Sequence, residues 1–504
     1  MLQFAAFSFI LPSSLFLLIL IYKVIFNRHA TRGSNLKLPP GPKRLPVIGN
    51  LHHMIGDLAH QRLYQLAKMY GPVFYLQLGE LPFVTITTPE AAKEVLMTQE
   101  LAFSDHPAYP PSQLTSYENS SIFFTPYGEF WRQLRKICVL GLLGFESVRS
   151  FKSIRENEVS NLIGYIESLS GLPLNLSDRI TACMNRVFSK ASFGETCKQQ
   201  DEFIALLHEG LRLAGRLDIA ELFPSLKFLR YLSGAKFKLN KIKRKYDKIL
   251  NTILADHKMR RENLGGQAGT LDKEDIVDSY CVFRNLTTAD SILQPTTLKD
   301  MISAGTTAPA ITVEWAMSEL LKNPRVMAQA QNEIRRVLKG KDRIQESDIE
   351  ELNYLKCIIK ETLRMHPPAP VIPRAPREGC KVNGCDIPMN STVLIHVYAL
   401  GRDPRYWTNP EKFEPERFIE SSVDYKGLYF QLLPFGSGRR MCPGIAFATA
   451  SVELMLASLL YHFDWKLANG QAPEQLDMTE VYGVAARRKD ELYVIASPCT
   501  SNSA

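Results

Sequence analysis

A glycine-rich loop that carries one cysteine and leads directly into an apolar helix constrains this chain more than any other stretch. The loop spans residues 435–444, with the sequence FGSGRRMCPG, and apolar residues then dominate as far as His462. Glycines allow the backbone to approach a flat partner closely, and Pro443 suits the first helical turn. Cys442 therefore precedes a helix N-terminus, whose N–H groups and positive dipole end favour a thiolate. The pattern indicates a thiol presented to a bound group.

The spacing within this loop is specific. The pattern Phe-x-x-Gly-x-Arg-x-Cys-x-Gly is met by Phe435, Gly438, Arg440, Cys442 and Gly444, and it resembles the haem-binding loop of the cytochrome P450 family. In that family the cysteine thiolate is the axial ligand of the haem iron. The resemblance implies haem b as the cofactor, Cys442 as the metal ligand and these five residues as the proximal side of the haem site.

Three further residues match family positions that bind the haem propionates. Trp131 and Arg135 are four residues apart and share one face of a predicted helix. Alone, this spacing equally indicates a surface cation–π pair. The resemblance implies that both contact propionates, with Arg374 as a third candidate.

A second informative stretch is the apolar helix predicted over Leu298–Lys322, which Gly305 and Pro309 interrupt. It resembles the long helix on the distal side of the haem. The family pattern Ala/Gly-Gly-x-Asp/Glu-Thr falls here on Ala304, Gly305, Thr306, Thr307 and Ala308. The last four of these are the candidate catalytic residues.

This stretch departs from the family pattern. Thr307 stands where the family has an acid, and Ala308 stands where it has a hydroxyl that helps to deliver protons during oxygen activation. Pro309 has no N–H, which leaves the Gly305 carbonyl free to bind water. Ordered water, held by that carbonyl or by a threonine, could supply the protons. A hydroxyl of the substrate could also supply them. Ordinary oxygenation is the favoured reaction. Oxidative coupling, cyclisation or rearrangement is an alternative, as is a haem-binding sensor or carrier without turnover.

An acid and an arginine three residues apart, Glu361 and Arg364, share one face of an apolar helix. A buried ion pair needs further partners. The segment Pro415–Phe418 resembles the family segment in which an arginine, here Arg417, completes the network. We assign these three residues to folding and haem retention. The residues expected to face the substrate are Ala304, Val371, Ile372, Val481, Tyr482, Gly483 and Val484.

Charge and cysteine usage exclude some classes of function. The net charge is +8, but no basic stripe interleaved with aromatic residues appears, so nucleic-acid binding is not expected. The nine cysteines are odd in number and scattered, which argues against a disulfide scaffold and for a reducing compartment.

The first residues predict a membrane anchor. No charged side chain occurs over Leu2–Tyr22, and Lys23, Arg28 and Arg32 follow. This length and charge asymmetry predict a single span over residues 1–26, with the remaining chain in the cytosol. A basic, proline-rich hinge is expected over 27–50, and a catalytic domain over 51–504. The endoplasmic reticulum membrane is the expected location.

The resemblance implies a mainly α fold with small β-sheets (α+β), a triangular prism around a buried haem. It is strongest to the plant microsomal group of specialised metabolism, so a lipophilic terpenoid, alkaloid or phenolic substrate is expected. No flavin or nicotinamide domain is present, so electrons are expected from NADPH–cytochrome P450 reductase, with cytochrome b5 as a second possible donor. Arg439, Arg440 and Lys136 are expected to help the reductase to dock near Cys442.

Overall fold

The computed structural model describes most of the chain downstream of the predicted anchor. The described residues are 36–56, 58–107, 121–194, 202, 205, 206, 209, 221–226, 235–263, 275–278, 295–482 and 485–499. The anchor over 1–26, the first part of the hinge, and Gly483 and Val484 lie outside them. The chain divides into two compact units, one of residues 1–107, 218–233 and 373–396, the other of residues 108–217, 234–372 and 397–504.

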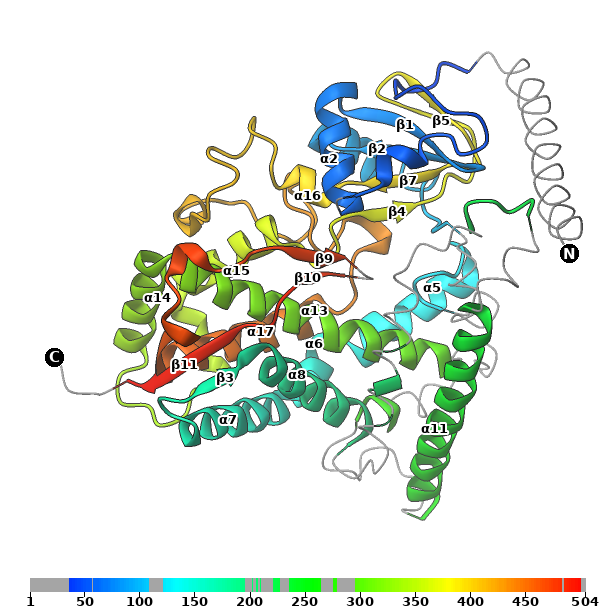
Figure 1. Ribbon diagram of the computed structural model, residues 1–504. Helices are drawn as coiled ribbons and strands as arrows, with labels where there is room; N and C mark the ends of the chain where they lie inside the picture. Colours follow the sequence, from blue (N-terminus) through cyan, green and yellow to red (C-terminus); the bar gives the residue numbers. More distant parts are fainter. Residues whose placement is uncertain are drawn as a thin grey trace, which may run out of the picture. The chain divides into compact units, whose positions relative to one another are not determined.

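The first unit is built on a small sheet with strand order β1-β2-β7-β4 (Figure 1). The predicted hairpin is confirmed, because β1 (Val73–Leu78) pairs antiparallel with β2 (Leu81–Ile86), and β2 continues in parallel to β7 (Thr392–Ile395). Both strands of the hairpin are almost continuously buried, as expected for a sheet covered on both faces. The other elements are α2 (Ala59–Tyr70), α3 (Pro89–Lys93), β4 (Ile372–Arg374), β5 (Cys380–Val382) and β6 (Cys385–Ile387).

The second unit is mainly helical. Its helices are α5 (Glu129–Lys136), α6 (Phe145–Ser150), α7 (Lys152–Ser168), α8 (Leu176–Phe193), α11 (Ala235–Asn263), α13 (Pro295–Lys322), α14 (Pro324–Val337), α15 (Asn353–Met365), α16 (Val397–Leu400) and α17 (Ile445–His462). Its strands are β3 (Pro173–Asn175), β8 (Phe463–Leu467), β9 (Glu480–Tyr482), β10 (Ala486–Arg488) and β11 (Tyr493–Pro498). They form a sheet of order β3-β11-β8 and a β9–β10 hairpin.

The core of this unit is organised around α13, which packs against α8 and α17 (Figure 1). Trp315 and Leu320 of α13 are fully buried, as are Leu456 and Leu460 of α17. Within the described residues, α17 is the one helix long and apolar enough to cross a membrane, and 56% of it is buried. Its apolar character therefore reflects its place in the core.

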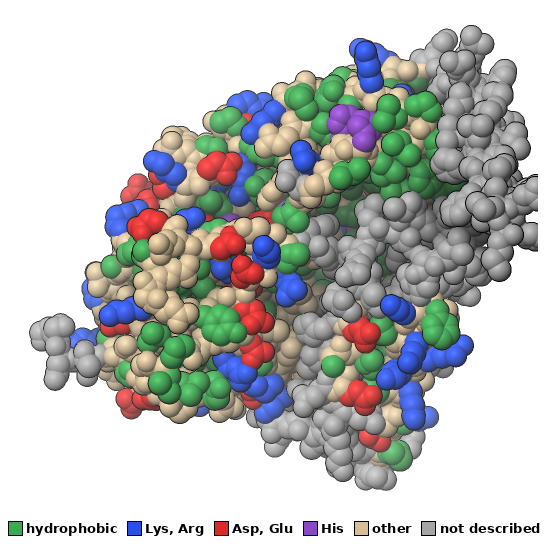
Figure 2. Space-filling model, viewed as in Figure 1, with side chains coloured by type: hydrophobic (Ala, Val, Ile, Leu, Met, Phe, Trp, Pro, Cys, Tyr) green, Lys and Arg blue, Asp and Glu red, His purple; other side chains and the backbone are tan. Residues whose placement is uncertain are grey.

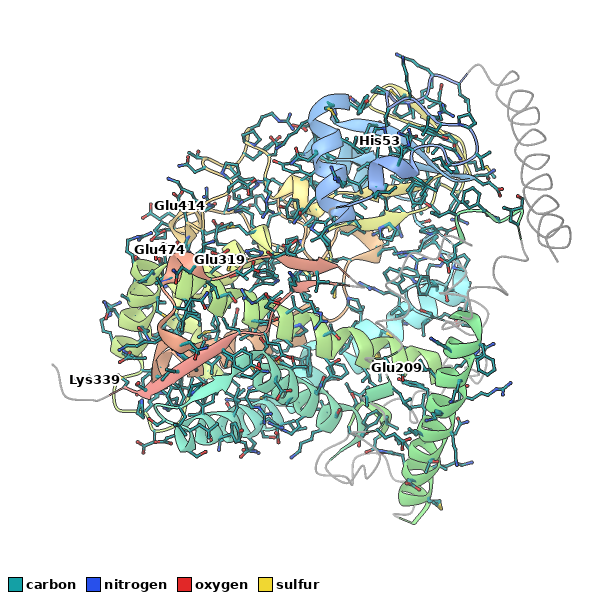
Figure 3. All side chains as sticks on the ribbon, in the orientation of Figure 1. His53, Glu209, Glu319, Lys339, Glu414 and Glu474 are labelled. Carbon is teal, nitrogen blue, oxygen red and sulfur yellow. The ribbon has the colours of Figure 1, made fainter. Side chains whose placement is uncertain are left out.

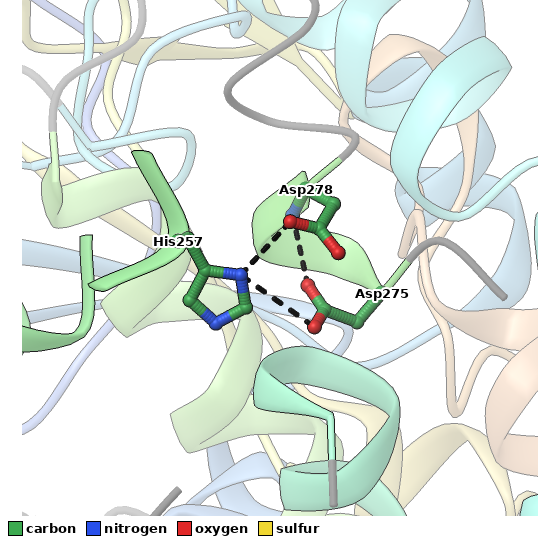
Figure 4. A group of neighbouring side chains, drawn as sticks. All are labelled: His257, Asp275 and Asp278. Carbon is green, nitrogen blue, oxygen red and sulfur yellow. Dashed lines mark hydrogen bonds and ion pairs between the residues drawn. The ribbon is translucent and has the colours of Figure 1, made fainter. Parts of the chain in front are cut away.

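A buried polar cluster joins the later part of α11 to residues 275–278 (Figure 4). His257 Nδ1 lies 2.9 Å from Asp278 Oδ1 and 3.7 Å from Asp275 Oδ2. The backbone N–H of Asp278 donates to Asp275 Oδ1 over 2.8 Å, which caps the short turn. We interpret the cluster as a structural connection between the two segments.

The face drawn in Figure 2 carries basic and acidic side chains interspersed over its described part. No single-signed stripe runs across that part of the surface.

Candidate active site

The cysteine loop has the conformation that its glycines predict. Gly436 and Gly438 have φ angles of 73° and 71°, a left-handed region that side chains rarely enter. The Ser437 hydroxyl donates to the Gly427 carbonyl over 2.6 Å, which holds the loop against an earlier segment. The Cys442 N–H closes the loop by donating to the Phe435 carbonyl over 2.9 Å. The helix α17 then begins at Ile445, as predicted.

Opposing effects act on the pKa of Cys442. A hydrogen bond from the Gly444 N–H and the Arg135 guanidinium both lower the pKa of the thiol, but burial raises that pKa by more. The helix N-terminus therefore lowers the pKa of Cys442, as expected, but exclusion of water raises that pKa by more. A cation bound at the sulfur favours the thiolate.

The side-chain N–H groups of Arg440 and Trp131 donate to backbone carbonyls of the protein. The Arg440 guanidinium donates to the carbonyls of Ile122 (3.3 Å), Phe123 (3.2 Å) and Thr125 (2.6 Å), and it lies 4.2 Å from the centre of the Trp131 ring. Trp131 Nε1 donates to the same Ile122 carbonyl over 2.9 Å. The pair therefore ties the cysteine loop to the segment before α5, and the propionate role expected for Trp131 would require its only N–H donor to change partner.

The other two arginines expected at the haem lie in different units. Arg135 on α5 is half-buried beside Cys442, and burial lowers the pKa of its guanidinium. Arg374 is buried in the first unit, where Nη1 lies 3.2 Å from His106 Nε2 and 2.9 Å from the Pro373 carbonyl. Arg135 is close enough to Cys442 to lower the pKa of its thiol.

The four candidate catalytic residues of α13 divide between its faces. Thr306 is 1% exposed and its hydroxyl donates to the Ile302 carbonyl over 3.0 Å. Ala304, Thr307 and Ala308 have the i, i+3, i+4 spacing of one stripe, and they are more exposed than the neighbouring buried positions. The Thr307 hydroxyl is buried and has no hydrogen-bond partner within the described residues.

Gly305 lies against a neighbouring helix. A Cβ built on Gly305 would lie 2.0 Å from Cε2 of Phe188 on α8. The glycine therefore permits α13 and α8 to pack closely, which the sequence pattern had not indicated. Phe188 was missed because nothing local connects it to a residue more than a hundred positions away.

The predicted ion-pair network is present and completely buried. Glu361 and Arg364 are both 0% exposed, and they form two hydrogen bonds of 2.7 and 2.8 Å. Arg417 Nε donates to Glu361 over 3.1 Å. Arg364 also donates to the carbonyls of Gly401 and Pro410 over 2.6 and 2.8 Å, so the pair has the additional partners that burial requires.

The residues expected to face substrate are described in part. Val371 and Ile372 are half-buried, and Cδ1 of Ile372 would lie 3.6 Å from a Cβ on Gly436, so this side chain is beside the cysteine loop. Val481 is half-buried on β9, where it pairs with Arg487 of β10. For Tyr482 the structure describes the backbone, which pairs with Ala486.

The comparison with known families decides the identity of this arrangement. The family model described as cytochrome P450 matches residues 39–494. The chain belongs to the cytochrome P450 family. It is therefore a haem-thiolate monooxygenase, an oxidoreductase that uses a redox partner and a small-molecule substrate.

The chain is similar over nearly its whole length to several plant enzymes. A melianol synthase from Citrus sinensis is 49% identical over 467 residues, covering 92% of this chain and 91% of that protein. The premnaspirodiene oxygenase of Hyoscyamus muticus is 44% identical, covering 96% and 97%. A zebrafish cytochrome P450 structure with progesterone has a TM-score of 0.74 at 21% identity, over 88% of this chain and all of that one. This last likeness confirms the mainly α fold with small sheets.

The residues of this P450 fit a haem. The Cys442 sulfur is presented on a loop with glycines in left-handed backbone, and the described cysteines form no disulfide with one another. The unpartnered Thr307 hydroxyl lies on α13, the helix that packs against α17 behind the cysteine loop. When bound, the haem supplies the iron at which dioxygen is activated. Cys442 would hold that iron, and Arg135 would lie beside Cys442.

Proposed function

We propose that this P450 inserts an oxygen atom into a lipophilic plant metabolite of the terpenoid, alkaloid or phenolic class. The family match over 39–494, together with the Cys442 loop, carries this proposal. The names of the relatives support the substrate class, since they include melianol synthase, premnaspirodiene oxygenase and tabersonine 6,7-epoxidase. Melianol synthases from several plants are 47–49% identical to this chain, so a terpenoid is the first substrate to test.

The cellular setting is part of the same proposal. An anchor over 1–26 would hold the enzyme on the cytosolic side of the endoplasmic reticulum membrane, which suits a lipophilic substrate. NADPH–cytochrome P450 reductase would supply electrons, with cytochrome b5 as a second donor. Lys136 and Arg439 are exposed, and so suited to an acidic partner surface, whereas Arg440 is committed to backbone carbonyls. NADPH oxidation in membranes with and without the reductase tests the pairing.

Thr307 supports ordinary oxygenation by this chain. Proton delivery needs a donor within hydrogen-bond reach of the reacting atoms, directly or through one water. The Thr307 hydroxyl is unpartnered, and it shares its stripe with Ala308, where the family's usual hydroxyl is missing. We propose that Thr307 Oγ binds the water that passes protons toward the substrate side of the haem.

The reaction type is tested by turnover under labelled dioxygen. Membranes that contain this P450 and the reductase are incubated with NADPH and a panel of terpenoids, alkaloids and lignans. We expect one product that carries a single labelled oxygen atom. An unlabelled product that still depends on NADPH would instead indicate coupling or rearrangement. No NADPH consumption above the reductase background with any compound would indicate a sensor or carrier.

The role of Thr307 predicts opposite effects for two substitutions. Thr307→Val should lower the product formed per NADPH by about tenfold or more and raise hydrogen peroxide, because it removes the proton-passing hydroxyl. Ala308→Thr should raise the product and lower peroxide by restoring the family's hydroxyl. Peroxide and product are measured in the same reaction.

Thr312→Val is the matched control. The Thr312 hydroxyl lies on the same helix but donates to the Ala308 carbonyl over 3.0 Å. Its removal should leave the ratio of product to peroxide unchanged. Equal ratios in the Thr307→Val variant and the parent enzyme would exclude a role for Thr307 in proton delivery.

A further inference from the structure

A buried histidine outside the haem loop lies between two carboxylates from different elements. His366 directly follows α15 and is 7% exposed. Its Nε2 lies 2.7 Å from Glu319 Oε1 on α13, and its Nδ1 lies 3.5 Å from Glu480 Oε1 on β9. Glu319 and Glu480 are themselves 5% and 9% exposed. Figure 3 marks Glu319 at this position.

An aromatic ring completes the surroundings of His366. The imidazole stacks on the indole of Trp315, also on α13, with ring centres 4.0 Å apart and planes 6° apart. The guanidinium of Arg488, on β10, lies 5.6 Å from the centre of the same indole. The face of an indole attracts cations, so the ring favours a charged imidazole as the two carboxylates do.

Two buried carboxylates, Glu319 and Glu480, both face His366. A protonated imidazole offsets part of this negative charge, with Arg488 as a further cation in the same surroundings. Only a protonated imidazole can donate from both ring nitrogens, and so to both carboxylates at once. Loss of the proton would remove the donation from His366 to one of the two buried carboxylates, which is costly away from water.

We infer that His366 is a positioning residue, whose imidazolium ties Glu480 of β9 to Glu319 of α13 and so holds the β9–β10 hairpin on that helix. α13 contacts β10 as well, and the Ala486 N–H donates to the Pro368 carbonyl over 2.9 Å. The inference rests on the proposed function in one respect, because Val481 of β9 is expected to face the substrate. The connection itself is independent of which substrate is oxidised.

The connection should weaken as the pH rises. The two carboxylates raise the pKa of His366 above its ordinary value, against the effect of burial. A group whose pKa is raised by folding contributes stability that is complete below the unfolded pKa of about 6.5 and is lost as the pH rises through the folded value. Arg488 stays charged throughout this range. Its guanidinium also interacts electrostatically with Glu314, Asp477 and Asp490.

Hydrogen exchange of the full-length haem-loaded protein in lipid nanodiscs tests the inference without a substrate. The probes are the backbone amides of 480–482 and 486–488, with rates corrected by an unstructured peptide of the same sequence. We expect these amides to exchange about tenfold or more slowly at about pH 6 than at about pH 9, while amides of the β3-β11-β8 sheet show no such change.

Two variants separate this role from general destabilisation. His366→Phe keeps a ring on Trp315 and removes the charge, and Glu480→Gln keeps the size of the side chain and removes one carboxylate. Both should abolish the pH dependence at the hairpin. Glu474→Gln, an exposed residue before β9 (Figure 3), should leave it intact.

Unchanged hairpin exchange between the two pH values in the parent protein would overturn the inference. So would a persistent pH dependence in His366→Phe protein that still gives the haem-thiolate spectrum. Failure of the proposed function is seen separately, as the absence of labelled product or of that spectrum in the parent enzyme.

Discussion

Replacing Cys442 by alanine is expected to abolish the haem-thiolate spectrum and to reduce turnover to background. Among the described cysteines Cys442 is the one on the glycine loop, and electron donation from a thiolate there to a bound iron favours O–O cleavage. The reduced carbon monoxide complex of the parent enzyme should show the red-shifted Soret band of thiolate-ligated haem. NADPH-dependent product formation is measured on the same preparations.

Cys138→Ala is the matched control for this experiment. Cys138 is also buried and also interacts electrostatically with Arg135, but it follows α5 and is not on the glycine loop. Its variant should keep the Soret band and the turnover. A Cys442→Ala protein that retained both would show that the iron is held elsewhere.

Replacing Glu361 by glutamine is expected to cause the largest loss of stability. The substitution leaves Arg364 and Arg417 without their shared carboxylate, and Arg364 is 0% exposed. Removing one partner of a buried ion pair costs about 3–5 kcal/mol, against a total stability of about 5–15 kcal/mol for a typical domain. The urea midpoint for loss of the haem absorbance should fall markedly, and the yield of haem-loaded protein should fall with it.

Glu129→Gln is the matched control because Glu129 and Arg132 have the same three-residue spacing on α5 but are 66% and 57% exposed. Exposed pairs contribute little because water already stabilises both charges. The urea midpoint of this variant should equal that of the parent. A Glu361→Gln midpoint equally unchanged would show that the buried network does not retain the haem.

Much of the local structure could be predicted from spacing alone. The helix from Ile445 to His462 has the predicted bounds, and the distal helix begins at Pro295, three residues before its predicted start at Leu298. The hairpin Val73–Leu78 with Leu81–Ile86 also forms. Such features depend on residues close together in the chain, where periodicity and turn chemistry act directly.

The use of individual donors could not be predicted in the same way. Trp131 and Arg440 match family positions, yet their N–H groups bind the carbonyl of Ile122, and Arg440 binds those of Phe123 and Thr125 as well. A motif specifies which groups are available. Their partners come from loops whose course depends on the rest of the fold.

By itself the sequence predicted the iron ligand, the Glu361–Arg364 pair and the family, because each depends on residue types at short, fixed spacing. Only the tertiary structure decided that burial raises the pKa of Cys442 against the effect of the helix N-terminus, that Gly305 serves the contact with Phe188, and that Thr307 has a hydroxyl with no partner among the described residues. It also brought His366 between Glu319 and Glu480, which come from segments far apart in the chain. The physical reason is that pKa values and hydrogen-bond partners depend on water exclusion and on neighbours in space, neither of which is set by local sequence.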